Sequence, residues 1–126
     1  MITGKRKPSK SALKNKLDKV FSLVVRQRGR CERCFKAEGL QCSHIHSRTK
    51  MSVRWELQNA FCLCSGCHKF FWHQHPIDAA EWARKKMGEV SYDLLIVRAQ
   101  QIKRWTPFEM EILLHRLEGM LNEPTR

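Results

Sequence analysis

Cysteine is the residue type in this sequence whose spacing most clearly indicates chemistry. Four of the six cysteines form two C-x-x-C pairs. The pairs are Cys31 with Cys34 and Cys64 with Cys67. This spacing lets a tight backbone turn, or knuckle, present two sulfurs to one tetrahedral zinc ion. The sequence therefore predicts a four-cysteine structural zinc site, and we interpret the remaining two, Cys42 and Cys62, as small buried residues on two strands.

The stretch between the two pairs is longer than in an ordinary zinc ribbon, which has about 15 to 20 residues there. Side chains with catalytic capacity lie within this stretch and directly after the second pair. They are His44, His46, Asn59 and His68. An imidazole titrates near neutral pH, so a histidine can take a proton from water or bind a metal ion. The spacing predicts a reactive centre beside the zinc.

This arrangement resembles the HNH endonuclease family, whose pattern is a knuckle, a strand ending in histidine, an asparagine opening a second strand, and C-x-x-C-H. The matching residues are Cys31, Cys34, His44, Asn59, Cys64, Cys67 and His68. The resemblance covers about residues 29–75 and is similar to phage-encoded members, including the recombination-type group. It implies a small α+β fold: a ββα-metal motif stapled by a zinc knuckle pair, with flanking N- and C-terminal helices.

The resemblance also implies an activity, the metal-dependent hydrolysis of DNA phosphodiester bonds, by nicking or double-strand cutting. His44 would be the general base for the attacking water. Asn59 would hold the ring of His44 through its amide oxygen, as a carboxylate does in a hydrolase triad. His68 would ligate a catalytic divalent ion, separate from the structural Zn²⁺. Mg²⁺ or Mn²⁺ is expected, and other transition ions also fit the ligands.

One position departs from the family pattern. An aspartate or histidine that also binds metal usually precedes the catalytic histidine, whereas this sequence has Ser43, a poor ligand while its hydroxyl is protonated. Two residues are candidates for the missing ligand. His46 would share a strand face with His44, and His73 lies one residue past the next helical turn from His68. The sequence leaves both open.

Basic residues beside the predicted centre are candidate phosphate contacts, because they flank His44 and His68 on the hairpin and the helix. They are Arg48, Lys50, Arg54 and Lys69. The whole chain has a formal net charge of +12, and a basic protein gains affinity for DNA by displacing its counterions. DNA is therefore the expected partner.

The pattern along the chain predicts the elements that must position these residues. Apolar residues at helical spacing from Ser11 end at Gly29, so a helix should lead to the first knuckle. Residues 40–45 and 60–63 suit two strands joined by a long basic loop, followed by a helix that starts at or inside the second knuckle. Further helices should fill 77–122, with start signals at Asp78 and Glu81, at Ser91, and at Thr106 to Glu109.

At 126 residues the chain is expected to form one domain, residues 11–126, with catalytic core 29–75 and C-terminal helices 77–122, after a basic flexible arm, 1–10. No run of about 20 apolar residues is present, and the first residues lack the apolar centre of a secretion signal. We expect a cytoplasmic protein that does not enter a membrane. The oligomeric state is open.

Two other functions fit the same residues. A non-catalytic zinc module that binds nucleic acid would need only the charge and the knuckles. An accessory subunit of a phage packaging or recombination machine would use the C-terminal helices to bind a larger protein. Plasmid nicking separates the nuclease from the non-catalytic module, whereas an accessory subunit could be a nuclease that is weak alone.

Overall fold

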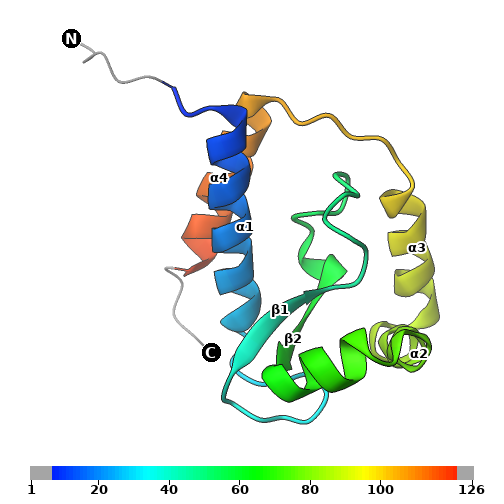
Figure 1. Ribbon diagram of the computed structural model, residues 1–126. Helices are drawn as coiled ribbons and strands as arrows, with labels where there is room; N and C mark the ends of the chain where they lie inside the picture. Colours follow the sequence, from blue (N-terminus) through cyan, green and yellow to red (C-terminus); the bar gives the residue numbers. More distant parts are fainter. Residues whose placement is uncertain (1–6, 122–126) are drawn as a thin grey trace.

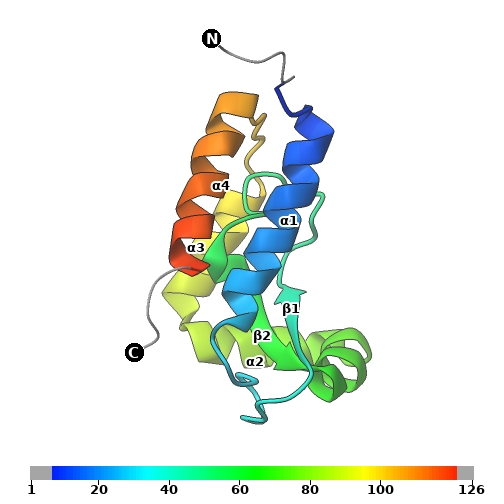
Figure 2. The ribbon, with the colours of Figure 1, turned by 90° about the vertical axis from the view of Figure 1, so that its left-hand side faces the viewer.

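The computed structural model describes residues 7–121 and has a small α+β fold. Four α-helices surround a two-stranded antiparallel hairpin (Figures 1 and 2). Of the predicted arm, 1–10, residues 1–6 lie outside the described part, and Lys10 already belongs to the first helix. No helix among the described residues is long and apolar enough to cross a membrane.

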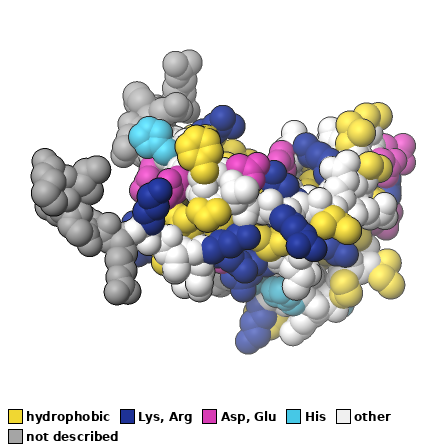
Figure 3. Space-filling view, turned by 90° about the horizontal axis from the view of Figure 1, so that it is seen from above, with side chains coloured by type: hydrophobic (Ala, Val, Ile, Leu, Met, Phe, Trp, Pro, Cys, Tyr) yellow, Lys and Arg dark blue, Asp and Glu magenta, His cyan; other side chains and the backbone are white. Residues whose placement is uncertain are grey.

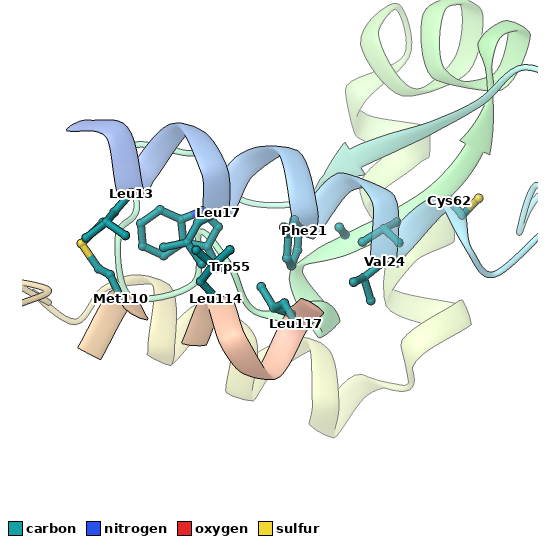
Figure 4. Packing of buried hydrophobic residues seen from close by; sticks show 11 residues of the cluster. Leu13, Leu17, Phe21, Val24, Trp55, Cys62, Met110, Leu114 and Leu117 are labelled. Atoms are coloured by element: carbon teal, nitrogen blue, oxygen red, sulfur yellow. The ribbon is translucent and has the colours of Figure 1, made fainter. Parts of the chain in front are cut away.

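The N-terminal helix, α1, spans Lys10–Arg26 and is capped by the Ser9 side chain, which accepts a hydrogen bond from the amide of Ala12. Helix α4, Pro107–Leu121, lies beside it. Figure 4 shows the core between them, where side chains of both helices interdigitate around Trp55. The buried residues of α1 and α4 in this core are Leu13, Leu17, Phe21, Val24, Val25, Met110, Leu114 and Leu117.

The hairpin consists of β1, Leu40–His44, and β2, Ala60–Cys64, paired in register with Cys42 opposite Cys62. Every residue of β2 is buried, because each face of the strand is covered by a different layer. Ala60 and Cys62 face the core of α1 and α4, whereas Phe61 and Leu63 face a second core. Covering on both faces explains the short apolar run of this strand.

A π-helix, Cys67–His73, follows the hairpin and leads into α2, Pro76–Met87, and α3, Glu89–Ala99. The order strand, strand, helix is confirmed, but the helix is wound more widely than expected. Aromatic residues join this region to the second core: Phe61, Trp72 and Trp82 meet edge to face or tilted. Helices α2 and α3 thus cover the hairpin on the side away from α1.

Two of the predicted helix starts are wrong. Helix α2 begins at Pro76, so Asp78 lies inside its first turn instead of capping it, since proline at the first position already fixes the entry. Helix α3 begins at Glu89 directly after Gly88, whose φ of +90° makes the turn, and Ser91 is therefore internal. The third start is confirmed by reciprocal bonds between Thr106 and Glu109, at 2.9 and 3.1 Å.

Candidate functional site

The four predicted zinc ligands come together at the end of the hairpin. The sulfurs of Cys31, Cys34, Cys64 and Cys67 all lie within 4.8 Å of one another. In each knuckle the backbone amide of the second cysteine donates to the sulfur of the first, at 3.4 Å. This cluster could hold a Zn²⁺ ion, as the spacing predicts.

The electrostatics of the cluster favour a cation at its centre. Burial raises the pKa of the Cys31 thiol, but hydrogen bonds from backbone amides outweigh it and lower this pKa to about 6. Burial, together with the neighbouring sulfurs, raises the pKa of Cys67 to about 12. Sulfurs this close resist joint ionisation, so a fully deprotonated cage needs the positive charge of a metal.

Backbone geometry brings the two knuckles together. Gly39 has a φ of +62°, and a Cβ on it would meet the hydroxyl of Ser65 at 3.2 Å. Phe35, directly after Cys34, also has a positive φ, of 68°, although it carries a side chain. The turn from the first knuckle to β1 therefore contains two residues, Phe35 and Gly39, in the left-handed region, which favours glycine.

A cleft of about 430 Å³ opens beside the zinc cluster and contains the two central histidines of the sequence prediction. His44 lies at the end of β1 and His68 in the π-helix. The cleft is lined by Asp18, Ser22, Cys42, His44, Ser47, Arg48, His68, Trp72 and His73. Helix α1 supplies one wall, which the sequence analysis did not anticipate.

His44 is fixed on both its edge and its face. Its Nε2 lies 3.1 Å from the backbone carbonyl of Arg54, and its ring stacks on Phe21 of α1 at 5.3 Å. A carbonyl only accepts, so Nε2 carries the proton and Nδ1 is left with the lone pair. Burial lowers the pKa of His44, partly offset by the hydrogen bond to Arg54. The imidazole is therefore neutral at pH 7.

The expected hydrogen bond from Asn59 to the ring of His44 is wrong. Asn59 is fully buried, and its amide binds backbone instead. Its Oδ1 accepts from the amide of His46 at 2.8 Å, and its Nδ2 donates to the carbonyls of His46 and Val53 at 3.0 and 3.1 Å. Asn59 thus joins the two ends of the loop that carries Arg54, because buried loop backbone must find partners.

His68 and His73, both in the π-helix, point toward each other in the cleft. Their Nε2 atoms lie 3.0 Å apart, with the rings at 90° to each other. In an α-helix, residues five apart would point about 140° away from each other. The π-helix, with its i to i+5 hydrogen bonds, places them on one side. Of the two candidates for a second ligand, the structure brings His73 against His68, whereas His46 does not line the cleft.

Ser43, the departure from the family pattern, touches the same histidine. Its hydroxyl is fully buried and lies 2.6 Å from Nδ1 of His68. If Nδ1 donates to this hydroxyl, the lone pair of His68 sits on Nε2, the atom that faces His73. Burial, followed by the neighbouring His73, lowers the pKa of His68 and keeps its imidazole neutral. Ser43 therefore orients His68.

The pair of imidazoles fits a divalent metal ion. Two nitrogens bound to one ion at about 2.0–2.1 Å would lie roughly 2.9–3.4 Å apart for angles between 90° and tetrahedral. The observed 3.0 Å falls in that range, and it also allows one Nε2 to donate to the other without metal. Two protein ligands leave several positions open for water or phosphate oxygens.

The four predicted phosphate contacts differ in their surroundings. Arg48 lines the cleft, while Lys50 and Lys69 are exposed outside it. Arg54 donates to both carboxylate oxygens of Asp18 along one edge of its guanidinium, from Nε at 3.0 Å and from Nη2 at 2.7 Å, and only 15% of its side chain is exposed. Asp18 also accepts from Trp55 at 2.8 Å.

Sequence reasoning missed Asp18, which ties α1 to the loop behind His44. The signal was present, because Asp18 is the one acidic residue in a basic helix and directly follows a residue of its apolar face. Burial raises the pKa of Asp18, but its bonds to Arg54 and Trp55 outweigh this and hold it below its usual value. Searches among protein-family models, curated proteins and solved structures found no match to this chain.

Proposed function

We propose that this protein is a metal-dependent DNA endonuclease of the HNH type. One observation carries the proposal: two histidine Nε2 atoms 3.0 Å apart lie in the same cleft as a neutral, oriented His44. Phosphodiester hydrolysis needs a base for water and a positive charge beside the phosphate. The residues of this cleft can supply both.

His44 would act as the base through Nδ1, since its Nε2–H is held by the carbonyl of Arg54. A water proton passes to Nδ1 as the water oxygen bonds to phosphorus and the P–O bond to the leaving oxygen breaks. His68 and His73 would hold the divalent ion, Mg²⁺ or Mn²⁺. When bound, that ion neutralises charge on the phosphate and stabilises the leaving oxygen.

Arg48 is the cation best placed to bind the substrate phosphate, because it lines the cleft and is exposed. We assign Arg54 a positioning role instead, since its guanidinium is bound to Asp18 and its carbonyl orients His44. Asn59 would act in the same way, by holding the loop closed. The Zn²⁺ at the four cysteines would be structural and separate from the catalytic ion.

Nicking of supercoiled plasmid with Mg²⁺ or Mn²⁺ tests the proposal. His44→Ala should lower the rate about 10²- to 10⁴-fold, the usual contribution of a general base. His73→Ala should raise the metal concentration needed for half-maximal rate, whereas the control His75→Ala, two residues on and exposed, should not. Intact plasmid with wild-type protein at every metal tried would refute the nuclease and favour a non-catalytic binding module. Full activity in His44→Ala would refute this cleft as the source of the nicking.

A further inference from the structure

A second hollow, of about 510 Å³, lies on the face of the molecule where α1 and α4 begin. Helix α1 contributes Lys10 and Lys14, and the segment between α3 and α4 contributes Arg104. The lining residues are Lys10, Ser11, Lys14, Met51, Lys103, Arg104, Trp105 and Met110, which we call the basic groove. Figure 3 shows this face, with Lys and Arg side chains gathered across its centre among hydrophobic ones.

The charge of the basic groove is of one sign. Four of its eight lining residues are basic and none is acidic. Lys103 is paired with Glu109 at 2.8 Å, but Lys10, Lys14 and Arg104 have no carboxylate within 4.0 Å among residues 7–121. Three uncompensated cations around one hollow create a positive potential that attracts an anion.

The basic groove also has a rigid apolar part. The indole of Trp105 donates to the carbonyl of Met51 at 2.9 Å, which holds the ring against the loop that starts at the candidate cleft. The half-buried Met51 adds to this surface, and the fully buried Met110 lies beneath it. Cations beside an apolar surface suit a DNA backbone, in which charged phosphates alternate with sugars.

The basic groove and the candidate cleft lie along the same row of α1. Lys10, Lys14, Asp18 and Ser22 are spaced four apart, and side chains at this spacing follow one another on a helix face. The first two line the groove and the last two line the cleft. At 1.5 Å per residue, the centres of the two pairs are separated by about 12 Å along the helix.

We propose that the basic groove binds the phosphate backbone of the same DNA strand that enters the cleft. This inference rests on the proposed nuclease function. A separation of about 12 Å corresponds to three or four nucleotides at 3.4 Å per nucleotide of duplex. The groove would bind phosphates three or four nucleotides from the scissile phosphate. It would contribute to DNA affinity and fix the position of the strand in the cleft, without taking part in the reaction.

A charge-matched pair of variants tests the groove. Lys10→Glu with Lys14→Glu removes two of its cations, while Lys16→Glu with Lys19→Glu makes the same charge change at exposed positions of α1 outside both hollows. Each pair is combined with His44→Ala, so that binding of a labelled 20-base-pair duplex is measured without cleavage. The readouts are Kd and its salt dependence.

The groove pair should weaken binding about tenfold near 0.1 M salt and lower the slope of log K against log salt by about two, one unit for each lost phosphate contact. The control pair should change Kd less than threefold and leave the slope unchanged. Arg104→Glu, on another segment, should weaken binding in the same direction as the groove pair.

Equal losses in the groove and control pairs would overturn the groove and leave the nuclease proposal standing. Selective loss in the groove pair, in a protein whose wild type does not nick plasmid, would support the groove and refute the nuclease. Circular dichroism of each variant checks that α1 remains folded. Glutamate at position 10 is in the first turn, where a negative charge favours a helix.

Discussion

Ser43 stands at the position where the family pattern has a metal ligand. In the structure its hydroxyl instead contacts His68, a proposed ligand. Its buried hydroxyl, 2.6 Å from Nδ1 of His68, fixes the ring so that Nε2 faces His73. A hydrogen bond to the second nitrogen of a metal-binding imidazole sets both its orientation and its tautomer. In the proposed metal site, the ligand that Ser43 does not provide would come from His73, five residues along the π-helix from His68.

We predict that Ser43→Ala weakens catalytic metal binding about 10- to 100-fold, the usual effect of losing such a partner. The measurement is the Mn²⁺ concentration that gives half-maximal nicking, with Mn²⁺ binding followed directly by calorimetry. Ser52→Ala is the matched control, because it also removes a 2.6 Å hydroxyl bond, to the carbonyl of Arg98, outside the cleft. An unchanged Mn²⁺ requirement in Ser43→Ala would contradict the role.

His44 predicts the pH dependence of nicking. Burial places its pKa below the ordinary value of 6.5, and the base is active only when unprotonated. The rate should therefore rise with pH and reach half of its plateau below pH 6.5, earlier than with a histidine of ordinary pKa. A pH profile at saturating Mn²⁺ is the measurement, and a rate still rising through pH 7.5 would exclude His44 as the base with this pKa.

At the scale of single residues, the sequence predicted the positions of the candidate site residues better than their hydrogen-bond partners. The four cysteines, His44 and His68 were placed correctly because their neighbours along the chain define the knuckles and the strand end. The partners of Asn59, Ser43 and Arg54 were not predictable. Each depends on side chains or carbonyls brought in by the long loop or by α1, which no local pattern specifies.

The two knuckles are the elements that hold the hairpin in place. Cys31 follows the end of α1, and the next residue exchanges hydrogen bonds with β2: the amide of Glu32 donates to the carbonyl of Cys62, and its carboxylate accepts from the amide of Cys62. A metal at the cluster would therefore fasten α1, β2 and the π-helix at one point.

Cys31→Ser should release zinc and abolish the cooperative thermal transition, because a structural zinc site contributes its binding energy to folding. Cys42→Ser is the matched control, since Cys42 lies on the hairpin outside the cluster, and should retain zinc. Zinc content after dialysis and melting by circular dichroism are the measurements. One equivalent of zinc retained by Cys31→Ser would refute the structural site.

Periodicity in the sequence predicted the elements, and their ends were harder to predict. Helix α4 started where its capping box indicated, because both partners of a capping box are local. The winding of residues 67–73 could not be predicted, since His68 and Trp72 find their hydrogen-bond partners on β1, 25 and 28 residues away in sequence. The burial of both hairpin faces could not be predicted either, because it depends on α1 and α2, which lie more than thirty residues apart in sequence.

The molecule as a whole is a hairpin between two helical layers. The layers bury histidines, and this burial makes the stability of the fold depend on pH. His44 and His46 both have lowered pKa values because of burial, and Nε2 of His46 has no hydrogen-bond partner among the described residues. The unfolded chain, with ordinary imidazole pKa values near 6.5, binds protons more readily below that pH. Acid therefore favours unfolding.

The contribution of the neutral, buried histidines to the free energy of unfolding should be complete above about pH 7. It should fall as the pH drops through 6.5 toward the pKa values of these histidines in the folded protein. Urea unfolding at pH 7.5 and 5.5, with zinc held constant, measures the fall. His46→Gln should reduce it, since one of the histidines whose pKa burial lowers, His44, His46 and His68, no longer titrates. A fall of the same size in His46→Gln would mean that His46 does not contribute.

The π-helix has a further consequence, for changes in chain length. Its wider turn contains one residue more than an α-helix needs to return to the same face. Removing one residue between His68 and His73, such as the exposed Phe70, would leave the histidines four apart, a spacing that an α-helix also places on one face. The segment can therefore lose one residue and keep its imidazoles together, whereas gaining one residue would separate them.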